Sequence, residues 1–473
     1  MRILPAVTPT PEQLTILLEN RPGVFVISGA AGSGKTTTAL LRLTSLCGQW
    51  LSRKQRLALQ EPVRVLVLTY NKTLEGYILE LAKAQVAGNS TLAAAVSAGD
   101  LILSVSTFGK WSLDLLEAGS APDADMCRAL LERFAASFGM ATRFVADEAE
   151  YVLGRFPSGQ LEDYLTCVRE GRGASPRMDA KMRRRLLDEV LYPYLKEKGA
   201  LGLRDWNDVT AEAVDAASDA WDIIIVDEAQ DFSANQVRAL MSHVADPHSV
   251  TYVMDSAQRI YPRSFTWREA GVTVAASRRL EANYRNTRQI ARFARSILDG
   301  MALGDDGTLP DFTQASTVGP KPRVIVGNFS AQVAWAVTNI VRRANLRDES
   351  VAFLHPLGGG WFSYLKGALA TSDVPFVQLT RASSWPGGDE TVALSTIHSA
   401  KGLEFDHVII LGLNQEVTPH GDEDGDAQLE ALRRLLAMGI GRARRSVTLG
   451  FKAGQGSSLI LLLDPATYEL VAL

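Results

Sequence analysis

Residues 24–41 read V-F-V-I-S-G-A-A-G-S-G-K-T-T-T-A-L-L, and the fold is best predicted from this stretch. The apolar, mostly β-branched run at 24–27 indicates a buried strand, and the turn after it fits the phosphate-loop pattern G-x-x-x-x-G-K-[ST]. A helical pattern follows from Thr37, so strand, loop and helix arrive in the order that phosphate binding needs. The strand before the loop argues against a chance glycine turn.

The glycines of this loop allow backbone N–H groups to turn inward around a phosphate. Lys35 is expected to reach the β- and γ-phosphates of ATP, and Thr36 is expected to hold Mg²⁺. The nucleotide-binding residues predicted here are Gly29, Ala30, Ala31, Gly32, Ser33, Gly34, Lys35, Thr36 and Thr37.

The composition describes an ordinary soluble globular protein of several domains. The chain has 473 residues, 46% of them hydrophobic and 22% charged, which suggests roughly three units at about 150 residues each. No apolar run approaches the ~20 residues that span a bilayer, and the N-terminus lacks the apolar core of a signal peptide. The run at 459–463 is expected to be a buried strand. The cysteines Cys47, Cys127 and Cys167 lie far apart, which argues against zinc, an iron–sulfur cluster or disulfides and favours the cytoplasm.

The charge balance excludes a general polycation. Lysine and arginine number 49 against 53 acidic residues, for a net charge of −4, so any contact with nucleic acid must use a local groove. The densest basic run, R-M-D-A-K-M-R-R-R at 177–185, is a candidate for that contact. A solvated helix face explains the same run equally well, and the sequence leaves both interpretations open.

Strand and helix signals divide the chain into an α/β unit, a helical insertion and a second α/β unit. Strands are expected at 63–69 and 101–108, helices dominate 112–200 with a loop at 171–176, and a buried strand returns at 223–226. Further strands are expected at 251–254, 323–327, 350–354, 391–395, 408–413 and 446–449. Polar residues follow several of these strands, at the sheet edge where open α/β sheets bind ligands.

The dipeptide Asp227-Glu228 follows the buried strand at 223–226 and is a candidate for catalysis. Asp227 is expected to hold Mg²⁺ through water, and Glu228 to polarise the water that attacks ATP. The alternative is a carboxylate pair that caps the next helix. The phosphate loop upstream favours the catalytic interpretation.

Nine segments together resemble the superfamily 1A helicases of the UvrD/Rep type. Their order along the chain matches the order of that family's motifs. They are T-P-E-Q (10–13), G-A-A-G-S-G-K-T (29–36), L-T-Y-N-K (68–72), V-S-T-F (105–108), V-D-E-A-Q-D (226–231), D-S-A-Q-R-I-Y (255–261), L-E-A-N-Y-R-N-T (280–287), T-I-H-S-A-K-G-L-E-F (396–405) and M-G-I-G-R-A-R (438–444).

The resemblance implies an α/β fold with two RecA-like, phosphate-loop-type parallel-sheet domains and a helical insertion in the first. The expected divisions are 1–111 and 201–275 for the first domain, 112–200 for the insertion and 276–473 for the second domain. It also implies roles at matching positions. Gln13 and Tyr284 would bind adenine, Gln230 and Gln258 would sense the γ-phosphate, Arg285 and Arg442 would act as arginine fingers, and Glu404 would contact the sugar side.

The resemblance further implies a single-stranded DNA site. The matching positions are Thr69, Tyr70, Asn71, Thr107, Phe108 and His398, with Trp267 or Phe265 as a further stacking aromatic. For Phe108, packing in the core is an equally good interpretation. For His398, a structural role is no less favoured than contact with DNA.

Two departures from the family pattern stand out. Gly441 replaces the threonine that usually precedes the last arginine finger, which puts the local loop geometry in doubt. The short stretch between His355 and Thr396 leaves no room for the family's second accessory domain. The resemblance thus implies a compact ATP-dependent translocase or helicase, moving 3′→5′ on single-stranded or 3′-tailed DNA. A partner protein such as a nuclease, in DNA repair or antiviral defence, is expected. The alternative is an ATP-controlled regulatory subunit that switches a nuclease without processive unwinding.

Overall fold

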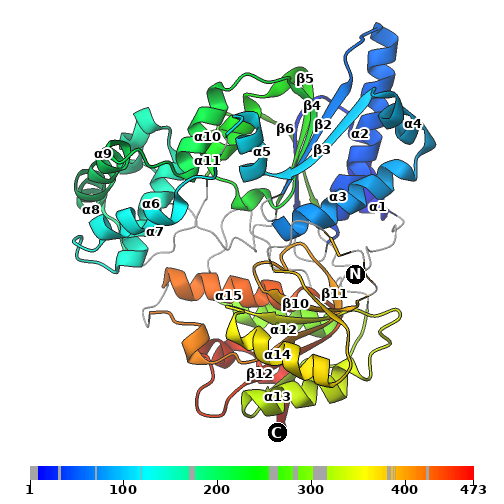
Figure 1. Ribbon diagram of the computed structural model, residues 1–473, viewed down its shortest axis with the longest axis vertical. Helices are drawn as coiled ribbons and strands as arrows, with labels where there is room; N and C mark the ends of the chain where they lie inside the picture. The colour runs from blue at the N-terminus through cyan, green and yellow to red at the C-terminus, as the bar shows by residue number, and fades with distance from the viewer. Residues whose placement is uncertain are drawn as a thin grey trace.

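The computed structural model describes residues 9–29, 33–69, 72–118, 120–169, 176–254, 265–280, 286–301, 317–380, 385–386, 388, 390–421 and 426–473. Two parallel β-sheets stack along the long axis of the molecule, each with helices on its faces (Figure 1). The α/β class predicted from the sequence is confirmed.

The first sheet has the strand order β3-β2-β4-β5-β1-β6, and every described pairing in it is parallel. Its strands are β1 (Gly23–Gly29), β2 (Val63–Thr69), β3 (Leu101–Thr107), β4 (Trp221–Val226), β5 (Val244–Met254) and β6 (Val274–Leu280). Because β6 pairs with β1, this sheet extends to Leu280, and the domain boundary expected at residue 275 falls inside β6.

Both faces of the first sheet are covered by helices. The helices are α1 (Pro11–Leu17), α2 (Lys35–Leu57), α3 (Lys72–Ala87), α4 (Ser90–Ala98), α5 (Phe108–Leu115), α10 (Trp206–Asp215) and α11 (Ala234–Met241). Alternate residues of β1 enter different cores, Val24 and Val26 with α5, α10 and α11, and Phe25 and Ile27 with α2 and α3. Burial on both faces explains the continuous apolar runs by which these strands were predicted.

The region between β3 and β4 is helical, with its own apolar core. Its elements are α6 (Ala124–Ala135), α7 (Thr142–Arg155), the 3-10 helix η1 (Ser158–Leu165), α8 (Ala180–Arg185), the π-helical segment η2 (Leu186–Leu191) and α9 (Tyr192–Ala200). Buried side chains from α6, α7, η1, η2 and α9 form one cluster, apart from the cores of the sheets. These helices project from one side of the first sheet (Figure 1).

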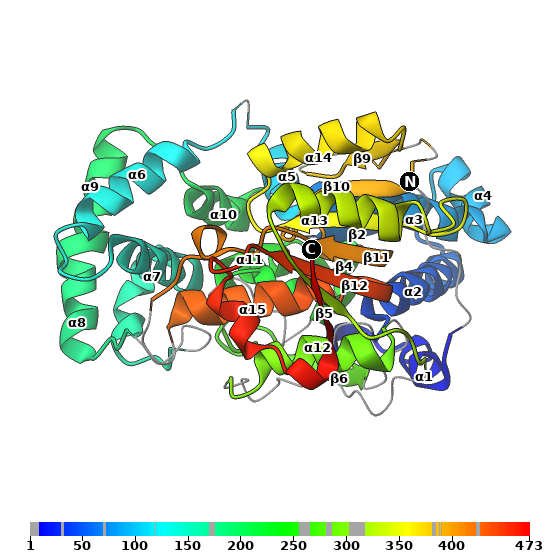
Figure 2. The same cartoon turned by 90° about the horizontal axis from the view of Figure 1, so that it is seen from below.

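The second sheet has the order β13-β7-β12-β11-β8-β10-β9 and is likewise parallel in its described pairings. Its strands are β7 (Arg323–Val326), β8 (Val351–His355), β9 (Phe376–Gln378), β10 (Val392–Thr396), β11 (Phe405–Ile410), β12 (Ala443–Phe451) and β13 (Glu469–Ala472). Helices α13 (Phe329–Ala336) and α14 (Gly360–Thr371) cover one face, and α12 (Arg288–Leu298) and α15 (Ala427–Ile440) cover the other (Figure 2). The remaining short helices are η3 (Ala229–Asp231), η5 (Val337–Val341), η6 (Gln415–Val417), η7 (Ser458–Leu462) and η8 (Pro465–Thr467).

Three local predictions need correction. The helix after the phosphate loop begins at Lys35 rather than Thr37, and the strand predicted at 101–108 ends at Thr107 because Thr107 caps α5. The expected strand at 459–463 was wrong. This segment is the 3-10 helix η7, with Leu461 87% exposed after the buried Leu459 and Ile460, a burial pattern that does not alternate as a strand would.

The strands that the sequence did not indicate are β6, β9 and β13. All three lie at the edges of the sheets that the structure describes, with a described neighbouring strand on one side. Edge strands bury less side-chain area, so β6 reads V-A-A-S-R-R-L and lacks the continuous apolar signal.

Candidate functional site

The phosphate loop joins β1 to α2 at the carboxyl edge of the first sheet. Gly34 is the N-cap of α2 and has a φ of 77°, in the left-handed region that favours glycine. The Lys35 Nζ donates to the carbonyl of Gly29 at 2.7 Å, so this side chain folds back across the loop. The described part of the loop therefore presents a helix N-terminus and a cation, both of which suit phosphate binding.

Gln13 lies against this loop. Gln13 and Thr10 form a reciprocal cap at the start of α1, in which the Thr10 N–H donates to the Gln13 Oε1 at 2.9 Å. A Cβ placed on Gly34 would come within 2.8 Å of the Gln13 Nε2. The amide of Gln13 is thus buried beside the loop, where the sequence expects an adenine contact.

Thr36 and Asp227 bring together two oxygen atoms suited to Mg²⁺. The Thr36 hydroxyl donates to the Oδ2 of Asp227, the residue that directly follows β4, at 3.0 Å. Burial, together with the neighbouring charge of Glu228, raises the pKa of Asp227 to about 7. A buried carboxylate beside a hydroxyl is a donor set that fits Mg²⁺, whose charge would favour the ionised form.

Glu228 is held in a conformation and a charge state that suit a catalytic base. Its φ of 53° is uncommon for a residue with a side chain. Burial acts to raise the pKa of Glu228, but the positive charges of Lys401, Arg442 and Lys35 prevail and hold it below its usual range. The Gln230 amide also donates to the Glu228 carboxylate. The carboxylate therefore stays ionised although it is buried.

Lys401 reaches this carboxylate from the second sheet. It lies in the turn after β10, is 3% exposed, and its Nζ is 3.3 Å from the Glu228 Oε2. It also forms an ion pair with Asp231. Sequence reasoning assigned no role to Lys401 or Asp231, although both stand within quoted motifs, because a motif does not show which charges meet across two domains.

Arg442 stands between the end of α15 and the start of β12, and is 3% exposed. Its Nε donates to the Met438 carbonyl at 3.3 Å, and its charge contributes to the low pKa of Glu228. Gly441 has φ −65° and ψ −8°, an ordinary right-handed conformation that any residue adopts. The glycine that departs from the family pattern therefore imposes no special backbone on Arg442.

The predicted DNA-facing residues that the structure describes at the ends of β2 and β3 are buried. Phe108 is 3% exposed and packs against Trp111 and Phe232, with ring centroids 5.5 and 6.0 Å apart. Thr107 accepts a hydrogen bond from the N–H of Lys110, and Thr69 is fully buried. Core packing and capping account for Phe108 and Thr107 in this structure, and their contact with DNA stays a prediction.

The aromatic candidates Trp267 and Phe265 lie in the turn before β6. The Trp267 ring is partly buried, 4.7 Å from the Tyr252 ring, and Phe265 meets it edge-on at 5.9 Å. Glu269 holds the turn by accepting from the Thr266 N–H at 2.8 Å and by pairing with Arg155 of α7. The helical region thereby contacts the turn that carries both aromatics.

His398 and Glu404 flank Lys401 in the segment between β10 and β11. Both are partly buried. Burial and the neighbouring Lys401 charge lower the pKa of His398, so the ring is neutral at pH 7. Several predicted site residues fall outside the described residues, and their roles stay predictions. They are Ala30, Ala31, Gly32, Tyr70, Asn71, Gln258, Tyr284 and Arg285.

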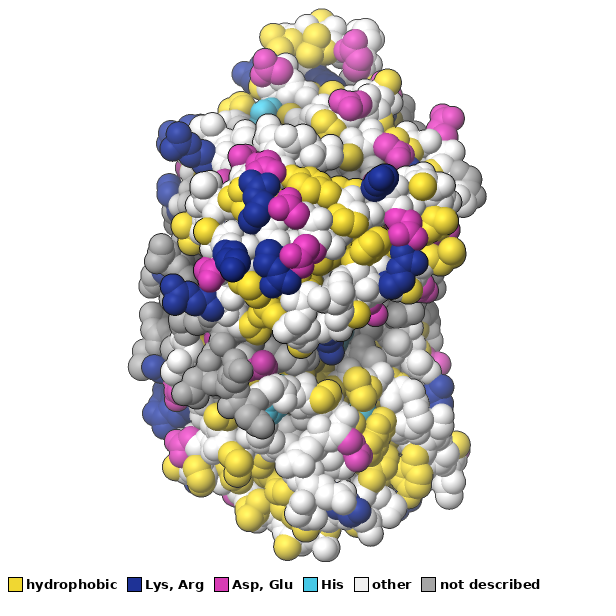
Figure 3. Space-filling view, turned by 90° about the vertical axis from the view of Figure 1, so that its left-hand side faces the viewer, with side chains coloured by type: hydrophobic (Ala, Val, Ile, Leu, Met, Phe, Trp, Pro, Cys, Tyr) yellow, Lys and Arg dark blue, Asp and Glu magenta, His cyan; other side chains and the backbone are white. Residues whose placement is uncertain are grey.

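The basic run at 177–185 is engaged in local contacts. Arg183 donates to the Tyr164 and Cys167 carbonyls at 2.9 and 2.7 Å, and Arg184 and Arg185 pair with Glu162 and Glu189. Figure 3, which faces the helical region, shows basic side chains interspersed with acidic ones. These contacts favour the solvated helix face over a DNA-binding stripe.

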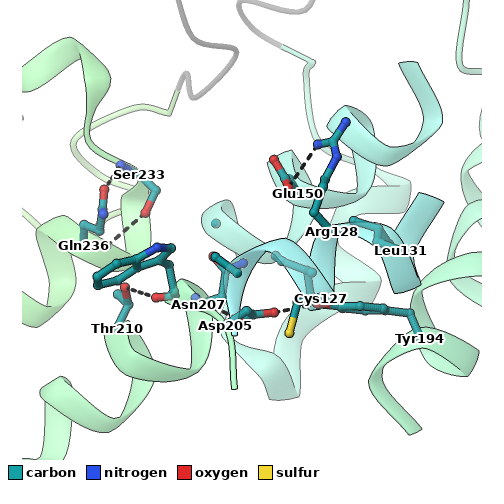
Figure 4. A pocket seen from close by; sticks show the side chains of 14 residues that line it. Cys127, Arg128, Leu131, Glu150, Tyr194, Asp205, Asn207, Thr210, Ser233 and Gln236 are labelled. Atoms are coloured by element: carbon teal, nitrogen blue, oxygen red, sulfur yellow. Dashed lines mark hydrogen bonds and ion pairs between the residues drawn. The ribbon is translucent and has the colours of Figure 1, made fainter. Parts of the chain in front are cut away.

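A separate cavity of about 110 Å³ lies where α6, α7 and α9 meet α10 and α11 (Figure 4). Its polar walls are bonded to one another, as in the Tyr194 hydroxyl that donates to Asp205 at 2.8 Å and the Arg128–Glu150 pair at 3.1 Å. Ligand pockets usually exceed about 300 Å³, so this cavity has room for a few waters but not for a nucleotide.

Comparison with known proteins finds two family models in this sequence. The AAA domain matches residues 13–263, more than half of the chain, and the UvrD-like helicase C-terminal domain matches residues 377–452. The first match covers the phosphate loop, Asp227 and Glu228, and the second covers Lys401 and Arg442.

The relatives are named as DNA helicases. The ATP-dependent DNA helicase UvrD2 of Mycobacterium tuberculosis (strain ATCC 25618 / H37Rv) is 24% identical over 563 aligned residues, covering 93% of this chain and 78% of its own length. DNA helicase II of Escherichia coli (strain K12) is 40% identical over 74 residues, covering 15% of this chain and 10% of its own. The crystal structure of the C-terminal domain of a possible DNA helicase from Lactobacillus plantarum WCFS1 covers 40% of this chain and 99% of its own, with 26% identity and a TM-score of 0.30.

The fold, the site and the family models together define an ATP-dependent DNA helicase. Within this class, the chain belongs to the superfamily 1A helicases of the UvrD/Rep type. In the part of the chain that the structure describes, every helix is too short or too polar to cross a membrane.

Proposed function

We propose that this protein is an ATP-driven translocase on single-stranded DNA that moves 3′→5′. One observation carries the proposal. The carboxylate at the proposed water-activating position, Glu228, follows a strand of the first sheet, yet the Nζ of Lys401 from the second domain lies 3.3 Å from it, and the charges of Lys401 and Arg442 help to keep it ionised despite its burial. A site completed from two domains couples ATP turnover to domain movement, and such movement drives a motor along a strand.

The residues of the site have the following proposed roles in ATP hydrolysis. Lys35 and the N-terminus of α2 would bind the phosphates, Gln13 the adenine and Glu404 the sugar side. Thr36 and Asp227 would hold Mg²⁺, which when bound neutralises charge on the β- and γ-phosphates. Glu228 would orient and polarise the attacking water, Gln230 would sense the γ-phosphate, and Arg442 would stabilise the charge that develops there. Tyr284, Gln258 and Arg285 are proposed for adenine stacking, γ-phosphate sensing and a second arginine finger.

The segment after β10 offers a route from DNA to the catalytic base. His398, proposed to face DNA, and Lys401, which contacts Glu228, lie in the same turn. A DNA strand that displaces His398 would also move Lys401. This movement would change the electrostatic environment of Glu228. This connection would make hydrolysis depend on bound DNA.

A partner protein is proposed because the chain has little surface for gripping a duplex. The connection between β9 and β10 is short, and two of its described residues, Leu379 and Trp385, contact α3. There the Leu379 carbonyl accepts from the Thr73 hydroxyl at 2.9 Å, and the Trp385 ring lies 4.8 Å from that of Tyr77. The resemblance places the second accessory domain of the family between His355 and Thr396, the stretch that contains this connection. A nuclease or another subunit, acting in DNA repair or antiviral defence, would supply the missing grip or use the motion.

The test measures ATPase activity with and without single-stranded DNA, and then unwinding of a 3′-tailed and a 5′-tailed duplex. We expect strong stimulation by the single strand, weak unwinding by the isolated chain, and a preference for the 3′ tail. Glu228→Gln serves as the inactive control. An ATPase that ignores DNA but responds to a co-purifying nuclease would instead support a regulatory subunit. Processive unwinding by the monomer would contradict the need for a partner.

A further inference from the structure

Asn286 joins two segments of the second domain that are distant in sequence. It precedes the N-cap of α12 and is 3% exposed. Its side-chain Nδ2 donates to the carbonyl of Gly441 at 3.1 Å and to the carbonyl of Ala443 at 2.5 Å. An amide nitrogen carries two hydrogens, so these two bonds use its full donor capacity.

The two acceptors are the carbonyls of Gly441 and Ala443, the residues on either side of Arg442. The Arg442 N–H bonds to the Gly439 carbonyl at 3.2 Å, and the Arg442 carbonyl accepts from the Phe405 N–H at 2.9 Å. Hydrogen bonds therefore hold the backbone before, at and after this residue. Because the guanidinium stands at the end of a long side chain, a small rotation at the Arg442 backbone would displace it far from the phosphate it is proposed to reach.

We infer that Asn286 is a positioning residue for Arg442, and that it makes the start of α12 and the turn between α15 and β12 move as one body. The inference rests on the proposed function of Arg442. It goes beyond that function because it adds, to the local contacts of Arg442 with Met438 and Gly439, one amide from a distant segment on which the aim of the guanidinium depends. It also explains how Gly441, the most flexible residue type, can stand beside a residue that must be aimed. The carbonyl of the glycine is fixed from outside its own segment.

The test compares Asn286→Ala with Arg442→Ala and with the double variant. Asn286→Ala should reduce kcat by about 10- to 100-fold while the Kd for ATP changes by less than about 3-fold, since only a transition-state contact is misaligned. Arg442→Ala should reduce kcat by about 10³-fold or more. The double variant should be no slower than Arg442→Ala alone, because a residue that acts through Arg442 has nothing left to position.

Gln332 is a matched control. Its side chain is fully buried, its Nε2 donates to the Gly327 carbonyl at 2.7 Å, and its Oε1 accepts from the Gly412 N–H at 3.0 Å. It thus ties two segments together as Asn286 does, but at the ends of β7 and β11 and without contact to Arg442. Gln332→Ala should lower the Tm and leave kcat of the folded protein within about 2-fold. Asn286→Ser keeps one donor in a smaller volume, and provides the kinetic measurement if the alanine variant does not fold.

The outcomes separate the inference from the function on which it rests. If Arg442→Ala has nearly normal kcat, the proposed role of Arg442 is wrong and the inference falls with it. If Arg442→Ala is inactive but Asn286→Ala and Asn286→Ser turn over normally, the inference alone is wrong. A double variant slowed by the product of the two single effects would show that Asn286 acts elsewhere, and would also overturn the inference.

Discussion

At the scale of single residues, the site depends on charges that are buried together. Asp227 and Glu228 are adjacent in sequence, but their environments push their pKa values apart. The pKa of Asp227 rises to about 7 through burial, whereas nearby cations hold that of Glu228 low. A pair of carboxylates separated in this way suits two different tasks, a metal ligand that is completed by its cation and a base that stays ionised.

The proposed roles of Lys35 and Glu228 predict distinct effects when each residue is substituted. Lys35→Ala should abolish productive ATP binding, because it removes the cation that lies across the phosphate loop. Glu228→Gln should leave ATP bound but reduce hydrolysis by at least about 10²-fold, since the base is lost while Thr36 and Asp227 remain. Nucleotide binding and single-turnover hydrolysis distinguish the two. Lys83→Ala and Glu80→Gln, which change an exposed pair on α3, are controls, and normal ATPase in either site variant would contradict the assignment.

His355, the last residue of β8, predicts a pH dependence of stability. Its Nδ1 accepts from the N–H groups of Leu357 and Gly358 at 3.1 and 2.9 Å, and its ring stacks on Trp361. Burial lowers the pKa of His355 from 6.5 to about 4. Between those values the unfolded chain binds a proton that the folded ring does not, so stability falls as the pH falls.

From pH 7 to pH 5, this group should lower the free energy of unfolding by about 2 kcal/mol. Urea denaturation at the two pH values measures the change. In His355→Asn, the side-chain oxygen can accept the same N–H groups but does not titrate, so the fall between pH 7 and pH 5 should be smaller by that amount. An equal fall in both proteins would exclude His355 as its source.

At the scale of elements, the position of α1 depends on a buried arginine from α2. The Arg42 NH1 donates to the Ile16 carbonyl at 2.9 Å and also to the Glu19 carbonyl, and its Nε donates to Thr251 at 3.2 Å. Its guanidinium lies 4.3 Å from the centre of the Phe25 ring. Burial lowers the pKa of Arg42 to about 10, so the group is still charged at pH 7. Arg42 thus anchors the end of the helix whose beginning carries Gln13.

Arg42→Met should therefore weaken nucleotide recognition through α1. We expect the Kd for ATP to rise by about 5- to 10-fold, the worth of about one hydrogen bond. The Kd for GTP should change less, because the contact proposed for Gln13 is specific to adenine. Binding of both nucleotides is measured by titration. Arg56→Met changes an exposed arginine of the same helix and is the control. An unchanged ratio of ATP to GTP affinity would contradict this role of α1.

At the scale of the whole molecule, the two sheets meet through both apolar and charged contacts. One apolar cluster runs from α2 and α3 of the first sheet to α12 and α15 of the second. Within the interface, Lys401 contacts Asp231 and Glu228, and their charges raise the pKa of Lys401 despite its burial. The ion pair therefore lies where domain movement and chemistry are coupled.

Lys401→Met should uncouple DNA binding from hydrolysis. It removes the cation that pairs with Asp231 and lies beside Glu228, and the loss of one partner from a buried pair costs roughly 3–5 kcal/mol, so the contact between the domains should loosen. We expect the ratio of DNA-stimulated to basal ATPase to fall by about 10-fold or more, while ATP still binds. Lys452→Met, an exposed lysine of the same domain, should retain the wild-type ratio. A variant that keeps full stimulation would exclude Lys401 from the coupling.

Local patterns in the sequence were sufficient to predict most of the strands and the main motifs of the protein. The phosphate loop directly follows β1, and Asp227 and Glu228 directly follow β4, so each motif is contiguous with its strand and is recognised from local sequence. The order of the motifs likewise indicated the helicase family before any distance was known. The edge strands β6, β9 and β13 escaped prediction because most of their side chains are exposed or only partly buried, and η7 was predicted as a strand because its apolar run is short and lacks a clear period.

Only the tertiary structure decided which charged residues come together to complete the site. Lys401 and Asp231 are 170 residues apart, and Asn286 and Gly441 are 155 residues apart, yet each pair is joined by a hydrogen bond. The packing of Phe108 against Trp111 and Phe232 was likewise seen only in the tertiary structure, and its contact with DNA stays a prediction. The sequence by itself determined which groups the chain carries and the local elements that present them. Which groups meet depends on how two separately formed sheets pack together, and no local pattern encodes those distances.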